Sequence, residues 1–477
     1  MKRLFALTTM TAALVLAGCS TIPDVAAPRM EVPDQFKAAP VADSQWKPAT
    51  PQDTQLRGDW WRQFGDSTLN QLIERALGSS EAGGAAGSPS LAVLAARVSQ
   101  ARAVARLADA ARAPQVSLQT DINRTGGNAT TPGYPDTLYR AQGIFNYELD
   151  LFGRLSDEAQ AARLDAQGQA MSYESARTAL AADIAQSWFQ LKGLDEDQKL
   201  LAATVALRED DVRLTDRRVS FGDATERDSA RAQTELANTR ADLYATQRSR
   251  ALVESTLAVL IGQPASSFSV AASDLPATLP TVPVGLPSTL LERRPDIAAA
   301  QRRLLAANAR IGAANAAFFP SVSLTAGAGF ASGQLSDLFK WGSRAWLLGP
   351  LAALPVFDGG ARRANLANAQ AGYEASVGEY RQQVLVAFKD VEDSLTTLST
   401  LSQQGDVTDQ AVRASTRATD LSRTQYREGF VSYFEVIDAQ RTTLALQRSA
   451  VSIRTQRATA LVGLMRALGG GWEQSAS

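Results

Sequence analysis

The chain has 477 residues, of which 45% are hydrophobic and 20% charged, with a formal net charge of −1. This composition is typical of a folded protein, and the charge balance gives no sign of nucleic-acid binding. Histidine is absent, which removes the commonest general base and neutral metal ligand. The single cysteine, Cys19, can form neither an intrachain disulfide nor a multi-cysteine metal site. We therefore expect no metal and no enzyme, although chemistry by carboxylates stays possible.

The first residues have the plan of a secretory signal. Lys2 and Arg3 precede an apolar stretch, 4–16, that is too short for a membrane span, and small residues follow it. The sequence LAGC, which ends at Cys19, resembles a bacterial lipobox. That resemblance implies a signal peptide over 1–18 and covalent lipid, including a palmitate-type acyl chain, on Cys19. Ser20 in place of aspartate favours sorting to the outer membrane. The alternative is a cysteine that lies there by accident.

Residues 19–58 are rich in proline, which interrupts helices. We interpret them as a lipid-anchored, extended tether on the body of the protein or on a neighbouring subunit, with disorder as the alternative.

A first structural repeat is predicted over 59–265. It starts with an apolar helical face within 59–77, a Gly/Ala/Ser-rich loop and an alanine-rich helix over about 91–112. Apolar and polar residues then alternate over 115–122 and again over 141–150. This period predicts two strands with one apolar face, which suit an ordinary antiparallel sheet or a transmembrane barrel.

The longest element is a predicted helix over about 156–219. It has no proline, and apolar residues recur at alternating spacings of three and four, which is the seam of a left-handed coiled coil. At 1.5 Å per residue it would be roughly 95 Å long, so it needs partners along its length. The chain reverses near Gly222, where Asp223 or Thr225 can cap a return helix that ends before Gly262.

The same order of elements recurs 207 residues later. After a linker over 266–290, a second repeat over 291–470 holds a helix to about 319, strands over 321–330 and 344–357, a long helix and a return helix; a short tail, 471–477, follows. One chain thus supplies four strands, which cannot close a barrel in lipid. Two chains would give eight strands around a filled interior, whereas three give twelve around a water-filled lumen.

Several segments resemble the outer-membrane factors of tripartite efflux systems, in the lipoprotein branch called the NodT family, with a TolC-like fold. They are DWWRQFGD, LERRPDI, the pair ELDLFGR and LPVFDGG, and DAQR. The resemblance covers 59–470; a Gly/Ala/Ser insertion at 83–88 departs from it. It implies an α+β membrane protein whose trimer forms a twelve-stranded transmembrane β-barrel, a periplasmic α-helical coiled-coil barrel and a mixed equatorial domain. It also implies a passive exit duct in the outer membrane, served by a periplasmic adaptor and an inner-membrane transporter of the RND type.

The helical turns are the predicted sites of adaptor docking. Their residues are Phe221, Gly222 and Asp223 in the first repeat and Glu428, Gly429 and Phe430 in the second. The resemblance further implies a periplasmic gate at Asp438 and Arg441, in which three copies of Asp438 could hold a cation. Phe434 lies one turn before Asp438 and would face the same way, so we add it to the predicted gate. The alternative is an ordinary surface pair between Asp438 and Arg441. The first repeat has Arg227 and Arg231 where the second has Phe434 and Asp438, so a gate could pair basic and acidic tips.

The family motif consists of Leu291, Glu292, Arg293, Arg294, Pro295 and Asp296. A catalytic interpretation of its two carboxylates competes with a structural one, which we prefer. In the structural interpretation Pro295 begins a helix, Asp296 lies favourably at its N-terminus, and the arginines pair across the equatorial domain.

Two tryptophans near the fourth strand, Trp341 and Trp346, either mark a membrane interface or are buried in a loop. The competing functions are a TolC-type protein-secretion channel, a structural coiled-coil envelope lipoprotein without a pore and, third, an envelope hydrolase.

Overall fold

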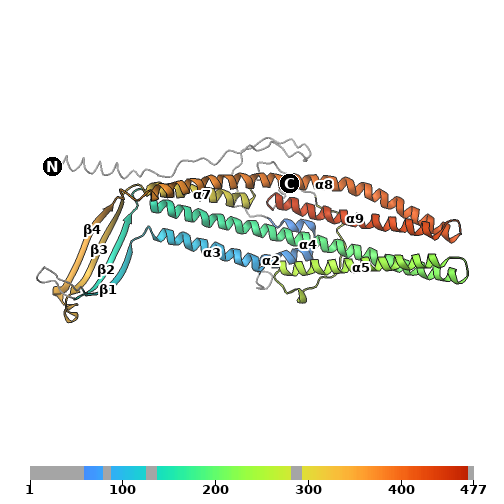
Figure 1. The fold of residues 1–477 in the computed structure, drawn as a ribbon, viewed down its shortest axis with the longest axis horizontal. Coiled ribbons are helices and arrows are strands. Elements are labelled where there is room, and N and C mark those ends of the chain that lie inside the picture. Colours follow the sequence, from blue (N-terminus) through green and yellow to red (C-terminus); the bar gives the residue numbers. More distant parts are fainter. Residues whose placement is uncertain (1–57, 79–86, 125–136, 281–292, 471–477) are drawn as a thin grey trace. The chain divides into compact units, whose positions relative to one another are not determined.

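The computed structural model describes residues 58–78, 87–124, 137–280 and 293–470 (Figure 1). Cys19, the tether, most of the insertion at 83–88, part of the linker and the C-terminal tail lie outside these ranges, as do Leu291 and Glu292 of the family motif. Predictions about them stay predictions.

Two sets of elements follow one another in the same order. The first set is η1 (Trp60–Phe64), α2 (Ser67–Leu77), α3 (Pro89–Ala110), β1 (Gln115–Arg124), β2 (Thr137–Leu149), α4 (Arg154–Ser220), α5 (Glu226–Leu260) and η3 (Ala265–Ser267). The second set is α7 (Pro295–Ala316), β3 (Ser321–Ser332), η4 (Leu335–Asp337), η5 (Trp341–Ser343), β4 (Arg344–Ala353), α8 (Ala361–Arg427) and α9 (Tyr433–Ala467). Helices α8 and α9 begin and end 207 residues after α4 and α5, so the offset read from the sequence holds at all four helix boundaries.

The chain divides into two compact units. The first contains the sheet, most of α3 and α7, and the first turns of α4 and α8; the second contains η1, α2, α5, α9 and the remainder of α4 and α8. No helix of the described residues is both long and apolar enough to cross a membrane.

The first unit is built on one antiparallel sheet in the order β1-β2-β3-β4 (Figure 1). Strands β2 and β3 come from different repeats and pair with each other, as at Phe145 and Ala326. β1 and β4 are the edges of this sheet, each with a single neighbour among the described strands.

Some predicted boundaries were wrong by a few residues. Strand β2 begins at Thr137, earlier than the alternation suggested, and β4 ends at Ala353 instead of 357. Its partner strand β3 begins at Ser321, which pairs with Ala353, so β4 has no described partner beyond that residue. Helix α7 ends at Ala316 instead of 319, because a residue before a proline, here Pro320, disfavours the helical region.

The two longest helices, α4 and α8, each begin at a capping aspartate. Asp150 accepts hydrogen bonds from the backbone N–H groups of Leu155 and Ser156, at 3.1 and 2.7 Å. Asp358 accepts from the N–H groups of Gly360 and Arg362, at 3.0 and 3.1 Å. The Arg362 side chain and these N–H groups lower the pKa of Asp358 to about 2. Both aspartates satisfy backbone donors that a helix N-terminus leaves without partners.

The core of the second unit gathers around α4. The predicted apolar face of α2 is buried there: Leu69, Leu72, Ile73 and Ala76. Asp66 caps α2 and also accepts from the indole of Trp188 on α4 at 2.9 Å. Lys192 lies 2.8 Å from the same carboxylate. This polar cluster fixes the short helix to the long one.

Helices α4 and α9 approach each other closely at Gly193. A Cβ atom on Gly193 would lie 2.1 Å from Oγ1 of Thr455 and 3.0 Å from its Cβ. Only glycine fits this helix crossing, which joins the two repeats.

Candidate functional site

The two helical hairpins of the second unit end in turns of the same kind. Gly222 and Gly429 have φ angles of +80° and +85°, in the left-handed region that glycine adopts without strain. Of the two candidate caps for α5, Thr225 is the one used: its hydroxyl accepts from the N–H of Asp228, whose carboxylate accepts from the N–H of Thr225. This reciprocal pair is a capping box, so the start of α5 is locally fixed.

The predicted docking residues present aromatic side chains at both turns. Phe221 is 81% exposed and Phe430 is 77% exposed. Asp223 occupies the position in the first turn that Phe430 has in the second, and Glu428 matches Phe221 in the same way. Each turn therefore carries one phenylalanine and one acidic residue, in opposite order. Exposed aromatic side chains are typical anchors in protein interfaces, so the two turns suit the binding of another protein.

The predicted gate residues lie on the first turns of α9. Phe434 is half exposed, and the guanidinium of Arg231 on α5 lies 5.5 Å from its ring centroid. Asp438 is exposed. The partner of Arg441 is Glu235 on α5, so the predicted alternative of a simple pair between Asp438 and Arg441 is not what the structure contains. The bond with Glu235, together with the nearby charge of Asp438, raises the pKa of Arg441.

Glu235 is the centre of a buried charge network that the sequence did not reveal. It is 6% exposed and lies 3.8 Å from Arg208 on α4, which is only 2% exposed. Arg208 also donates to the side-chain oxygen of Gln440 on α9. The amide of Gln440 in turn donates to Asp211 on α4 at 3.0 Å. Asp211 also accepts from Arg423 on α8 at 3.5 Å, so all four long helices meet through hydrogen-bonded and ion-paired polar groups.

A signal for this network existed in the heptad pattern. Position 208 lies in the seam between apolar residues Val205 and Val212, at the expected spacing of three and four. A charged residue at such a position either disrupts the packing of the seam or pairs with a buried partner. Arg208 pairs with buried partners, Glu235 and Gln440.

An apolar cluster lies beside the network, nearer the turns. It consists of Ala232, Tyr426, Tyr433, Val436 and Ile437. Arg218 at the end of α4 stacks on the Tyr426 ring, with 4.5 Å between guanidinium carbon and ring centroid. It also donates to the carbonyl oxygens of Tyr426 and Arg427 at 3.5 Å, where α8 ends. The first hairpin thereby caps the long helix of the second.

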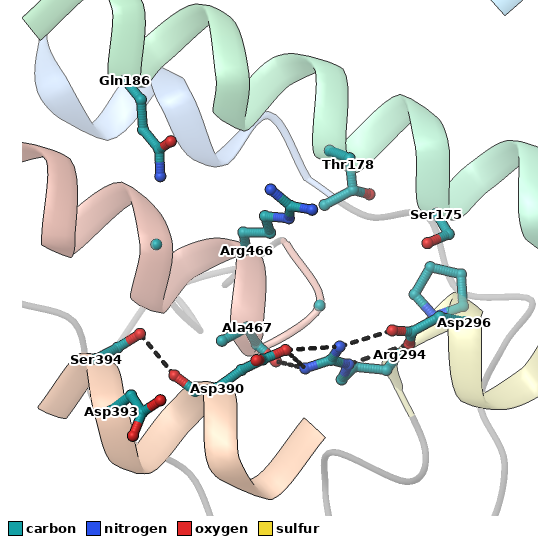
Figure 2. A pocket seen from close by; sticks show the side chains of 14 residues that line it. Ser175, Thr178, Gln186, Arg294, Asp296, Asp390, Asp393, Ser394, Arg466 and Ala467 are labelled. Carbon is teal, nitrogen blue, oxygen red and sulfur yellow. Dashed lines mark hydrogen bonds and ion pairs between the residues drawn. The ribbon is translucent and has the colours of Figure 1, made fainter. Parts of the chain in front are cut away.

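Three residues of the family motif, Arg294, Pro295 and Asp296, line a separate cavity of about 420 Å³ (Figure 2). Arg294, 8% exposed, donates to Asp296 at 2.6 Å, to Asp390 on α8 at 3.1 Å and to the carbonyl of Ala467 at 3.2 Å. Burial alone would lower the pKa of Arg294, but the two carboxylates outweigh it and raise that pKa. The arginine therefore acts as a clamp between the start of α7, the middle of α8 and the end of α9.

The clamp favours the structural interpretation of the motif. Pro295 begins α7 as expected, and Asp296 bonds both Arg294 and the side-chain amide of Gln383, the latter at 2.8 Å. The carboxylates of Asp296 and Asp390 are thus engaged in holding helices together.

The whole chain matches known proteins. The family model for outer membrane efflux protein matches residues 85–263 and 286–470. The chain belongs to the outer membrane efflux protein family. Outer membrane protein OprJ of Pseudomonas aeruginosa is 33% identical over 488 residues, covering 100% of this chain and 98% of OprJ. The cation efflux system protein CusC of Escherichia coli is 33% identical over 481 residues, covering 97% and 98%. The solved outer-membrane channel OprN is 29% identical with a TM-score of 0.85, covering 95% of this chain and all of the other.

The matches confirm the family read from the sequence and an outer-membrane location for this efflux protein. Its relatives are channels and efflux components, which fits a chain that is not an enzyme. Among the described residues no cluster of three or more acidic, histidine or cysteine side chains could hold a metal.

The two tryptophans near β4 are both exposed in this efflux protein. Trp341 is 74% exposed and Trp346 is 79% exposed, so burial within a loop does not describe either of them.

Proposed function

We propose that the protein is the outer-membrane exit duct of a tripartite efflux pump, through which small molecules pass passively from the periplasmic side to the exterior. The observation that carries this proposal is the two-sided character of strands β1 to β3 of the sheet, in a chain that matches the efflux family over residues 85–263 and 286–470.

The register aligns apolar residues across all four strands. Val116, Phe145, Ala326 and Leu348 form one such row. On the opposite face, strands β1 to β3 carry mainly polar or small residues, with Ile144 as an exception: Gln115, Ser117, Gln119, Asp121, Arg140, Gln142, Asn146, Glu148, Ser321, Ser323, Thr325 and Gly327. Strand β4 differs, because Leu347 and Leu351 lie on that face beside its small residues. An apolar outer face and a polar inner face are the pattern of a transmembrane barrel with an aqueous lumen.

The edge strands β1 and β4 require pairing. Their main-chain groups would be costly in lipid without partners, and four strands do not close. Val116, Leu118 and Ile122 on β1 are all more than two-thirds exposed, as expected for side chains that face lipid. Three copies of the chain, with β1 of one beside β4 of the next, give twelve strands and a lumen wide enough for water.

The periplasmic gate lies at the turns of the hairpins. Phe434 and Asp438 project from α9 beside the network in which the buried Arg208 and Glu235 and the exposed Arg441 hold both hairpins of one chain together. Three copies of Asp438 would narrow the passage and attract cations while repelling anions. The exposed Phe221 and Phe430 are the anchors for a periplasmic adaptor, which connects the duct to an inner-membrane transporter.

Relatives that match nearly the whole chain include proteins named as antibiotic, toluene and cation efflux components. Their breadth supports a duct whose substrates are set by the transporter it serves. Lipid on Cys19 anchors the duct, and no other cofactor is required.

Conductance across planar lipid bilayers tests the proposal. The purified full chain should migrate as a trimer after crosslinking and should conduct ions in discrete steps. A monomer without conductance would refute the duct and favour a structural envelope lipoprotein.

Deletion in a producing strain should raise intracellular accumulation of efflux substrates. Loss of a secreted protein with unchanged accumulation would favour a secretion channel instead. Cys19→Ser should abolish labelling with radioactive palmitate while trimers still form, which separates anchoring from assembly.

A further inference from the structure

The connection between β3 and β4 is an ordered loop with an exposed apolar surface. Residues 333–343 contain the short helices η4 and η5, and Ser343 donates to the carbonyl of Asp337 at 2.7 Å. Leu338 is buried inside the loop, while Phe339 and Trp341 are 71% and 74% exposed. The loop is therefore folded locally and still presents two aromatic rings outward.

A cation is stacked on one of these rings. The guanidinium carbon of Arg344 lies 3.5 Å from the ring centroid of Trp341, and its Nε donates to the carbonyl of Trp341 at 2.7 Å. Among the described carboxylates none is within ion-pair distance of Arg344, whereas the neighbouring Lys340 pairs with Asp337 at 2.7 Å. Arg344 is held in place and keeps donors for an outside anion.

The loop continues the apolar face of the sheet. Arg344 pairs with Phe330 across β3 and β4, so both lie on the face that carries Leu348, and Phe339 contacts the Phe330 ring edge-on at 5.6 Å. From Arg344 to Ala353 the strand rises about 30 Å, close to the ~25 Å apolar band of an outer-membrane barrel. Arg344 and Trp341 therefore lie at one boundary of that band, at the level of lipid headgroups.

The connections between strands and helices indicate whether this boundary of the apolar band is the periplasmic or the outer one. Helices α3, α4, α7 and α8 each join a strand at the opposite end of the sheet from the loop 333–343 (Figure 1). If those helices extend into the periplasm, as the proposed function requires, the loop faces the outer leaflet. The lipid there is lipopolysaccharide, whose lipid A portion carries phosphate groups.

We propose that Trp341 and Arg344 form a binding site for a lipid A phosphate, with the exposed rings of the loop packing against its acyl chains. Arginine suits this role because its planar fork bonds phosphate oxygens while its face stacks on an aromatic ring. The inference rests on the proposed membrane insertion of the sheet.

Lipid retention by the purified full chain, measured by native mass spectrometry, tests the site. The probes are hexa-acyl lipid A, the same lipid without phosphate, and phosphatidylglycerol. Arg344→Gln should lower lipid A retention about fivefold, the value for one cation lost near a lipid surface. Arg344→Lys should retain an amount of lipid A between those of the wild type and Arg344→Gln, because lysine keeps the positive charge but lacks the planar guanidinium group. Trp341→Ala should also reduce retention, and it provides a second test should Arg344→Gln not assemble.

The matched control is Arg363→Gln, which removes an exposed arginine from α8 and should leave retention unchanged. Equal retention by wild type and Arg344→Gln, or equal binding of the phosphate-free lipid, would overturn the proposal. Equal binding of phosphatidylglycerol would overturn the assignment to lipid A. Each preparation is also tested for bilayer conductance: a conducting protein whose Arg344→Gln variant keeps lipid A refutes this site alone, whereas a wild type that never conducts refutes the duct itself.

Discussion

Gly193→Ala should weaken the contact between the two repeats. The new methyl would lie 2.1 Å from Oγ1 and 2.9 Å from Cγ2 of Thr455. Rotation of that threonine would break its bond to the carbonyl of Val451 at 2.9 Å, and its Cβ would still be only 3.0 Å away. Overpacking of this kind costs ~1–3 kcal/mol, and the better helix propensity of alanine returns up to ~1 kcal/mol. We expect a net loss of about 1 kcal/mol.

The control is Gly405→Ala on α8, where a Cβ would meet Ile453 at an ordinary 3.7 Å. It should gain up to ~1 kcal/mol, so the two variants should differ by about 1–3 kcal/mol in opposite directions. Thermal unfolding in detergent, followed by circular dichroism at a helix band, ranks the stabilities of the two variants by their unfolding midpoints. Adding Thr455→Ala to Gly193→Ala should restore most of the loss. Equal midpoints for Gly193→Ala and Gly405→Ala, or no rescue by Thr455→Ala, would refute the close-contact argument.

Three further changes test the charges. Glu235→Gln should cost about 3–5 kcal/mol of stability, because Arg208 then remains buried without this carboxylate. The control is Glu209→Gln, which breaks an exposed ion pair and should cost at most ~1 kcal/mol. Equal thermal unfolding midpoints for the two variants would contradict this prediction. Asp438→Asn should reduce cation selectivity in bilayers, measured as a shift in reversal potential under a salt gradient, and an unmoved potential would remove this residue from the gate. Burial raises the pKa of Asp66, but Lys192 and the other hydrogen-bond donors outweigh it and keep that pKa below 3.8 in the folded protein. Ionised Asp66 therefore stabilises the fold fully above pH 3.8, and this stabilisation is lost as the pH falls through the lowered pKa of the folded state. Asp66→Asn should therefore flatten the acid side of the stability curve, and an unchanged slope would argue against this ion pair.

The long helices and the strands could be predicted because their signals are local. A seam at spacings of three and four, uninterrupted by proline, dictates one continuous helix, and α4 spans 154–220 against the expected 156–219. Alternation likewise specified the faces of β1 and β2. The ends of β4 and α7 were less predictable, because β4 ends where its partner β3 begins, and Pro320 acts directly only on the residue before it.

The pairing of charges could not be predicted in the same way. Arg441 and Glu235 are 206 residues apart, and the sequence around either residue does not indicate that the other is its partner. Sequence spacing specifies the face of a helix only approximately, and a rotation of one helix by a fraction of a turn would choose other partners. The clamp of Arg294 on Asp390, 96 residues away, depends equally on how α7 meets α8.

The duplication nevertheless explains why such pairs lie where they do. Arg441 meets Glu235, and Arg448 meets Asp242 at 3.2 Å, both at a separation of 206, next to the repeat offset of 207. Nearly equivalent positions of α5 and α9 therefore face each other, as residues do beside a twofold axis. The contact joins each position of one repeat to the position next to its equivalent in the other, so identical repeats could have formed the same Arg–Glu pair on both sides of the axis. Instead, the equivalents of Arg441 and Glu235 are the neutral Thr234 and Thr442, and the pair forms once. Divergence of the two copies thus made their contact asymmetric, and it placed the acid Asp438 and the base Arg231 at equivalent positions of the two hairpins.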